Sequence, residues 1–212
     1  MSQFESFLDA ITANENIKHV SFMVDSSPLL FFELQDAIEF HASRLLLLIK
    51  FCGSEIEEGP AIKGRTKLAK LDFFLRYPFY LNKALQKLGR EDLALHLEER
   101  ETRSIEATMI RYKYGPWDKK YYDVFAYLMA KGLMAIVPKG GIDHFALTPE
   151  GEAVVEMFLR QDAYNELVKR CQIIKKALGR RSGASLKEFI YRNFPEIVRQ
   201  SVGSIIEGVY HV

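Results

Sequence analysis

Cysteine and long apolar runs are both scarce in this sequence of 212 residues. The two cysteines, Cys52 and Cys171, form no CxxC pair, so neither a disulfide framework nor a cysteine-rich zinc site is indicated. No apolar run approaches the ~18 residues that a membrane-spanning helix needs. The first residues also lack the basic and then apolar regions of a secretory signal. We therefore expect a reduced, cytoplasmic protein with no membrane partner.

Familiar catalytic motifs are absent as well. The five histidines form no HxH, HExxH or H-x3-5-H pattern with cysteine partners, which leaves a zinc site without support. There is no GxxxxGK[ST] phosphate loop, no GxGxxG and no GxSxG nucleophile motif. The acidic runs "EIEE" and "EERE" have no partnering motif, and solvated carboxylates explain them. The sequence therefore predicts a protein that is not an enzyme and that holds no metal or cofactor.

The charge is balanced in total but unevenly distributed along the chain. Lys+Arg number 29 against 28 Asp+Glu, which gives a formal net charge of +1. Between Lys63 and Arg90, however, eight basic residues accompany a single acid, Asp72. A second stretch, from Lys169 to Arg181, has six basic residues and no acid. Such patches bind nucleic acid or an acidic partner, although ordinary solvated faces have the same composition.

The first third of the chain is predicted to contain one long helix. Over residues 33–52 the apolar residues follow the 3.6-residue period, and Gly53 suits a helix C-cap. His41 lies on the apolar face of this helix and is predicted to be a core histidine. Upstream, residues 3–12 have helical spacing, and residues 20–32 contain two short apolar runs compatible with strands or with buried helix turns.

A second helix is predicted to follow an acidic loop at residues 54–60. Thr66 can cap its start, and Leu68, Leu71 and Leu75 form a buried stripe. Pro78 stops or kinks the helix, and a shorter helix over residues 80–88 follows. The cations Lys67, Lys70 and Arg76 are expected on an exposed rim that meets a macromolecule, either protein or DNA.

Residues 109–151 have the pattern of a winged helix. A helix over residues 118–131 precedes an apolar strand at 133–137, a Pro-Lys-Gly-Gly turn and a returning strand at 145–148. Another helix begins at Thr148 or Pro149. A helix, a two-stranded wing and a helix in this order are typical of the winged helix-turn-helix.

The predicted fold is therefore mainly α with a small β wing. We expect an N-terminal segment at residues 1–32, a winged-helix domain at 33–158 and a C-terminal helical appendage at 159–212. In the appendage, helix is predicted to continue to about residue 178. A basic Gly/Ser hinge, a short helix over 186–194 and an exposed tail follow it.

The stretch "YKYGPWDKKYY" is the second candidate for a binding site. It interleaves aromatic and basic side chains, a mixture that nucleic-acid-binding proteins use for stacking and phosphate contacts. Packing of Trp117 at the start of the next helix, or a protein interface, would explain the same composition. The residues predicted to contact a partner or DNA are Arg65, Lys67, Lys70, Arg76, Arg111, Lys113, Trp117, Lys119 and Lys120.

Two stretches of the sequence, "GRTKLAKLDFFLRYP" and "MIRYKYGPWDKKYYDVFAYLMAKGLM", together with the closing "FALTPEG", resemble a bacterial protein family. It comprises the small winged-helix middle components of the ABC-three-component defence systems, which include the Lamassu-type anti-phage systems. The resemblance spans about residues 44–158. Its closing part is common to winged helices in general, whereas the first two stretches are more specific.

The resemblance implies a non-enzymatic adaptor for antiviral defence. Such a subunit would bridge an SMC- or RecF-like ATPase and an effector such as a nuclease, both encoded in the same operon, and its basic faces would also contact double-stranded DNA. Two alternatives stay open: a dimeric winged-helix transcription regulator and a kleisin-binding subunit of a condensin-like complex. Apart from Lys119 and Lys120 at its start, the helix predicted over residues 118–131 is largely apolar or aromatic, which favours protein contact over base reading.

Overall fold

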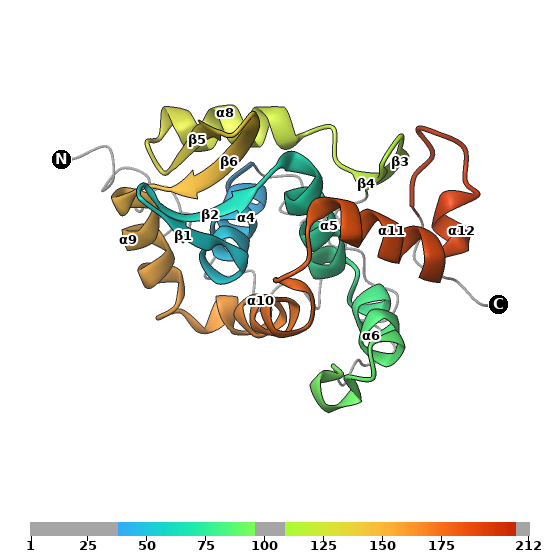
Figure 1. Ribbon diagram of the computed structural model, residues 1–212. Coiled ribbons are helices and arrows are strands. Elements are labelled where there is room, and N and C mark those ends of the chain that lie inside the picture. Colours follow the sequence, from blue (N-terminus) through green and yellow to red (C-terminus); the bar gives the residue numbers. More distant parts are fainter. Residues whose placement is uncertain (1–37, 96–108, 207–212) are drawn as a thin grey trace, which may run out of the picture.

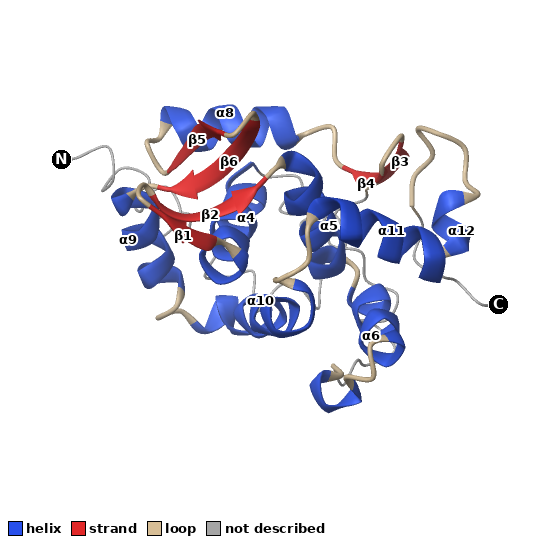
Figure 2. Cartoon of the chain, in the orientation of Figure 1, coloured by secondary structure: helices blue, strands red, loops and turns tan. Residues whose placement is uncertain are grey.

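The computed structural model describes residues 38–95 and 109–206 (Figure 1). This part of the chain is mainly helical, with a four-stranded antiparallel sheet and a separate two-stranded sheet (Figure 2). The elements predicted at residues 3–12 and 20–32, and the first turn of the helix predicted from residue 33, lie outside the described residues. Within the described ranges, no helix combines the length and the apolarity that crossing a membrane requires.

Helix α4, Ile38–Cys52, lies at the centre of the molecule. It packs against the sheet and against four further helices: α5, Arg65–Arg76; α8, Tyr121–Ala130; α9, Pro149–Phe158; and α10, Asn165–Leu178 (Figure 1). Its middle turns, including the run "LLLLI", are buried on every side. A helix that is apolar all round is one that the rest of the protein covers. The predicted helix and its end before Gly53 are confirmed over the described residues.

The four-stranded sheet has the strand order β1-β2-β6-β5, with every neighbouring pair antiparallel. Its strands are β1, Ser54–Ile56; β2, Gly59–Lys63; β5, Met134–Lys139; and β6, Ile142–Leu147. The predicted β5–β6 hairpin is confirmed, with Met134 opposite Leu147 and Lys139 opposite Ile142. The loop predicted at residues 54–60 is wrong, because these residues form the β1–β2 hairpin. Strand β2 joins the sheet by pairing with β6, where Ile62 lies opposite Phe145.

Helix α5 contributes more to the core than its leucine stripe. Every residue from Leu68 to Arg76 is buried, including the three charged side chains of that range. Gly64 is the N-cap, and no side chain caps this end, so the predicted Thr66 cap is wrong. Pro78 begins the next helix, α6, Pro78–Lys87, where its missing N–H needs no partner.

The C-terminal helices share the core of the preceding residues. Helix α10 packs on α4 and α5, and α11, Gly183–Asn193, packs on α5. A short turn of 3-10 helix, Asp162–Tyr164, separates α9 from α10, so the predicted helix does not run unbroken to residue 178. The division of the chain at residue 158 stays a prediction.

A small hairpin lies apart from the main sheet, next to α11 and the short helix α12, Pro195–Val198 (Figure 2). It consists of β3, Ile110–Tyr112, and β4, Gly115–Trp117. Backbone hydrogen bonds join it to the end of the described chain: the Arg111 N–H donates to the Ser204 carbonyl, and the Ile206 N–H donates to the Met109 carbonyl. The described part of the predicted tail is therefore paired with β3.

Candidate functional site

The side chain of Asp72 is the centre of a buried charge network. One of its oxygens accepts a hydrogen bond from Nε of Arg44 on α4 at 2.7 Å. The other lies 3.0 Å from Nε of Arg76, one turn further along α5, and accepts the Tyr121 hydroxyl of α8 at 2.7 Å. The two guanidiniums and the aspartate are fully buried. The network therefore joins three helices through one carboxylate.

Arg76 extends the network to the chain segment between β4 and α8. Its Nη2 donates to Asp118 at 2.6 Å, and the second oxygen of Asp118 accepts the Lys120 backbone N–H at 2.8 Å. The prediction that Arg76 lies on an exposed rim is wrong, because the guanidinium is completely buried between two aspartates. Its role in the structure is to fix the start of α8 against α5.

The protonation states of the network follow from its geometry. Burial alone would raise the pKa of Asp72, but the neighbouring Arg44 and Arg76 guanidiniums lower that pKa to about 2. Burial and the Asp72 charge raise the pKa of Tyr121 well above its ordinary value, so its hydroxyl remains a donor. Two positive and two negative side chains thus balance inside the protein. Such a balance is what makes buried charges tolerable.

His41 makes this network sensitive to acid. Its Nδ1 lies 3.0 Å from Nη2 of Arg44, and burial together with the positive charges of Arg44 and Arg76 lowers the pKa of His41 to about 4. In the unfolded chain His41 has the ordinary histidine pKa of ~6.5. At a pH between this value and the lowered one, the unfolded chain binds a proton that the folded protein does not bind. The free energy of unfolding therefore falls as the pH falls through this range.

We therefore expect the protein to lose about 1–3 kcal/mol of stability between pH 7 and pH 4.5 through His41. Urea denaturation at both pH values measures the loss. A His41→Gln variant, which cannot bind that proton, should have a flatter pH dependence than the parent protein. An identical slope in both proteins would show that His41 is not responsible.

Lys70 is buried beneath the β3–β4 hairpin. Its ammonium donates a hydrogen bond of 2.9 Å to the Pro116 carbonyl of β4, so the prediction that it lies on an exposed rim is wrong. Burial, together with the positive charge of Lys187 on α11, lowers the pKa of Lys70 to about 7. Gly115, which has a φ of 96°, allows the hairpin to approach Lys70 closely, because it has no side chain. A Cβ at this position would lie only 3.3 Å from Cε of Lys70.

Lys67 is half-buried and also makes an internal contact. Its ammonium donates to the Gly179 carbonyl at 2.8 Å, where α10 ends. A lysine at this position satisfies a carbonyl that has no partner in its own helix and complements the negative end of the helix dipole. The expectation that Lys67 is free for solvent or a partner is therefore wrong for this conformation.

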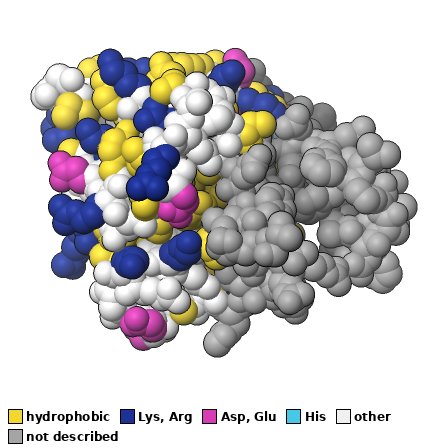
Figure 3. Space-filling view, turned by 90° about the vertical axis from the view of Figure 1, so that its right-hand side faces the viewer, with side chains coloured by type: hydrophobic (Ala, Val, Ile, Leu, Met, Phe, Trp, Pro, Cys, Tyr) yellow, Lys and Arg dark blue, Asp and Glu magenta, His cyan; other side chains and the backbone are white. Residues whose placement is uncertain are grey.

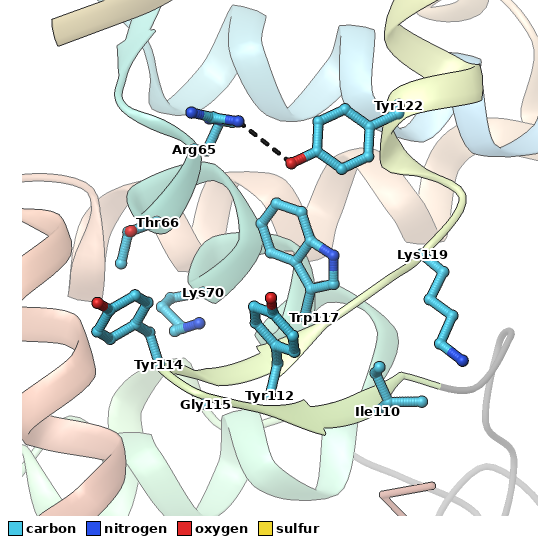
Figure 4. Close-up of a pocket in the computed structure, with 10 residues that line it drawn as sticks. All are labelled: Arg65, Thr66, Lys70, Ile110, Tyr112, Tyr114, Gly115, Trp117, Lys119 and Tyr122. Carbon is cyan, nitrogen blue, oxygen red and sulfur yellow. Dashed lines mark hydrogen bonds between the residues drawn. The ribbon is translucent and has the colours of Figure 1, made fainter. Parts of the chain in front are cut away.

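A cavity of about 520 Å³ opens between the start of α5, the β3–β4 hairpin and the start of α8 (Figure 4). We call it the ring-and-cation pocket. Its lining residues are Arg65, Thr66, Lys70, Ile110, Tyr112, Tyr114, Gly115, Trp117, Lys119 and Tyr122.

Four of the ten residues that line the ring-and-cation pocket are aromatic: Tyr112, Tyr114, Trp117 and Tyr122. The Trp117 ring lies 6.2 Å from that of Tyr112 and 6.1 Å from that of Tyr122, measured between centroids. Behind it, the buried Tyr121 ring makes an edge contact at 4.9 Å. Arg65 reaches across the opening and donates to the Tyr122 hydroxyl at 3.2 Å (Figure 4). Contacts with Tyr121 and Arg65 thus support the Trp117 and Tyr122 rings, and both rings line the pocket.

The charges around the ring-and-cation pocket are positive. Arg65, Lys70 and Lys119 line it, and within the part of the chain that the structure describes no lining residue is acidic. The first turn of α5 contains no acid either, although acidic side chains are the ones that a helix N-terminus favours. On the described part of the face that carries α11 and α12, lysine and arginine side chains are more frequent than acidic ones (Figure 3).

The structure brings four of the nine predicted contact residues together in this pocket: Arg65, Lys70, Trp117 and Lys119. Lys113 lies just outside, with its ammonium 5.6 Å from the Tyr114 ring centroid. The other four predicted residues, Lys67, Arg76, Arg111 and Lys120, are not lining residues. Sequence reasoning missed Thr66 on α5 and Ile110 on β3, because neither is basic or aromatic, and it missed the nearby Lys187 because that residue enters from α11, far along the chain.

Comparisons of the chain with family models, with curated proteins and with solved structures found no match. The family resemblance read from the sequence therefore stays a prediction. Among residues 38–95 and 109–206, no group of three or more histidine, cysteine, aspartate or glutamate side chains is placed to hold a metal ion.

Proposed function

We propose that this chain is a non-enzymatic adaptor subunit of an anti-phage defence complex, which bridges an SMC- or RecF-like ATPase and an effector such as a nuclease. The proposal is carried by an exposed rim of apolar and aromatic side chains beside the hairpin. Tyr112 and Tyr114 are 47% and 50% exposed, and Ile205 and Val202, on the segment that pairs with β3, are 54% and 64% exposed. Apolar side chains gathered on a surface in this way are typical of a docking site.

The order of the elements supports a winged-helix core for this adaptor. Strand β2 follows α4, pairs with β6 and lies two places from β5, while α8 directly precedes the β5–β6 hairpin. In a simple helix-turn-helix, a short turn joins the two central helices. Here the connection from α5 to α8 instead contains α6 and the β3–β4 hairpin. We propose that this enlarged connection is the part of the domain specialised for docking.

The surface of α8 supports an adaptor over a transcription regulator. In a winged-helix regulator, the helix before the wing enters the major groove and reads bases with cationic and polar side chains. The exposed residues of α8 are Tyr122, Asp123, Ala126, Met129 and Ala130, none of which is cationic. Contacts of the complex with DNA would then come from the basic face beside α11 and α12 (Figure 3).

Co-expression with the products of the neighbouring genes tests the adaptor function. We expect an SMC- or RecF-like ATPase to co-purify with the tagged chain in a fixed ratio and to stay bound through about 0.5 M salt, which screens purely ionic contacts. A Tyr112→Ser/Ile205→Ser double variant should release it. Leu159→Ser, which changes an exposed apolar residue at the end of α9, should not. A lone dimer that binds a specific duplex from its own upstream region would overturn the proposal.

A further inference from the structure

We propose that the ring-and-cation pocket is a nucleotide-binding site, in which the aromatic wall stacks on a base while Arg65 binds its phosphate (Figure 4). This goes beyond the adaptor function, because a subunit can dock an ATPase without binding a nucleotide and can bind a nucleotide without docking. The chemical class is a planar ring that carries a phosphate, supplied either as a free nucleotide or as an unpaired nucleotide of a DNA strand.

The size of the cavity suits such a ligand. At about 520 Å³ it falls within the ~300–1,000 Å³ typical of pockets for small molecules. The lining alternates aromatic with basic side chains, and Figure 4 shows the Tyr112, Tyr114 and Trp117 rings grouped around the Lys70 ammonium. A flat ligand that is apolar on its faces and negative at one end matches this lining.

The rings are supported in ways that favour stacking. The edge contact with buried Tyr121 fixes the Trp117 ring from behind. The centroid of the Tyr114 ring lies 5.6 Å from the Lys113 ammonium and 5.8 Å from the Lys187 ammonium. Cations over its ring hold this tyrosine in place although half of it is exposed. Side chains fixed before the ligand arrives lose less entropy on binding.

Among the described residues that line the pocket, none supplies a carboxylate to balance the positive charge. Lys70 has three N–H donors, and the Pro116 carbonyl accepts one of them. Burial and the positive charge of Lys187 lower the pKa of Lys70. The N-terminal turn of α5 adds backbone N–H groups with no side-chain cap. A phosphate at the mouth of the pocket would neutralise this concentration of positive charge.

A nucleotide fits these observations better than an acidic peptide does. Carboxylates would satisfy the cations, but they would leave the aromatic wall unused. Stacking of a base on an aromatic side chain tolerates every base, because each base has a flat π face. The exposed side chains of Tyr112, Tyr114 and Tyr122 therefore favour a ligand with a ring.

Trp117 provides the measurement, since it is the sole tryptophan of the chain and lines the pocket. The purified full chain is titrated with AMP, adenosine, ribose 5-phosphate, a single-stranded oligodeoxyadenylate and a polyglutamate peptide while tryptophan fluorescence is recorded. We expect saturable quenching by AMP with a Kd below about 1 mM, and binding at least roughly tenfold weaker when the base or the phosphate is missing. An oligonucleotide that binds more than about tenfold tighter than AMP, and loses affinity with salt, identifies a strand as the source. Equal affinities identify a free nucleotide.

Variants of exposed residues keep the test independent of folding. Tyr114→Leu and Arg65→Ala should each weaken AMP binding by roughly tenfold, the effect of losing a stacking ring or a phosphate contact. Tyr114→Phe retains the ring, and Lys176→Ala removes an exposed cation of α10, so both should bind like the parent. The proposal is overturned by the absence of saturable quenching, by equal binding of ribose 5-phosphate and AMP, or by tighter binding of polyglutamate. Co-purification of an ATPase does not enter this measurement, so either proposal can fail alone.

Discussion

An Asp72→Asn variant is expected to lose about 3–5 kcal/mol of folding free energy, because it removes the shared partner of two buried guanidiniums. Asparagine has nearly the same shape as aspartate, so the loss would not come from packing. It would come from leaving Arg44 and Arg76 with only Asp118 to balance them in a region without solvent. Much or all of the stability of a domain of this size would be lost.

Urea denaturation measures this loss, and two further variants separate its cause. Asp123→Asn changes an exposed aspartate of α8 and should shift stability by less than about 0.5 kcal/mol. The double variant Arg44→Met/Asp72→Asn removes one charge of each sign and leaves the Arg76–Asp118 pair. We expect it to be more stable than the sum of the two single changes predicts, by at least about 1 kcal/mol. Strict additivity would contradict the idea of a charge-balanced network.

Most helices could be predicted because their signals are local. The leucine stripe of α5, the C-terminal glycine after α4 and the Thr148 cap of α9 each lie within a few residues of the element that they mark. The β5–β6 hairpin was also predictable, since a glycine-containing turn joins two neighbouring apolar strands. For all of these elements, the interaction that decides the structure is short-range.

Elements that depend on distant partners were not predictable in the same way. Strand β2 is stabilised by pairing with β6, far along the chain, and the acidic and proline residues around it indicate a loop locally. Gly115 and Pro116 locally indicate a break in the chain, but they belong to β4, whose Pro116 carbonyl accepts a hydrogen bond from Lys70. Proline is compatible with a strand at a sheet edge, where its missing N–H leaves no bond unmade.

The charged residues of α5 show a limit of helical-wheel reasoning. Such reasoning places Lys70 and Arg76 away from the leucine stripe. In a helix that is covered on one side only, residues away from the stripe face the solvent. Here α4, β4, α10 and α11 cover α5 on several sides. A sequence signal for this was Arg44, an arginine directly before the leucine run of α4, because a buried cation requires a buried acid. Asp72 is the partner that it implied.

A Gly151→Ala variant should also unfold more easily, although alanine normally stabilises a helix. Gly151 lies in the first turn of α9, and a Cβ there would lie 2.0 Å from the backbone carbonyl oxygen of Leu133. The Leu133 carbonyl accepts a hydrogen bond from the Thr148 N–H at 3.3 Å. Thr148 is the N-cap of α9, and its hydroxyl accepts a hydrogen bond from the Gly151 N–H at 3.0 Å. The position of a Cβ is fixed by the backbone of its own residue, and the oxygen that it meets is a backbone atom. No side-chain rotation can therefore relieve the clash.

We expect Gly151→Ala to cost about 2–3 kcal/mol, the usual effect of inserting an atom into a well-packed site. Helix propensity alone gives the opposite sign, a gain of about 1 kcal/mol, so the direction of the change decides between the two effects. The matched control is Ala153→Gly on the exposed face of the same helix, where propensity acts alone and a loss of about 1 kcal/mol is expected. The midpoints of urea denaturation of both variants measure the effects. A stabilised Gly151→Ala protein would mean that α9 does not begin against the backbone of Leu133, and that the strand β5 which follows Leu133 is held in place by its pairing with β6 alone.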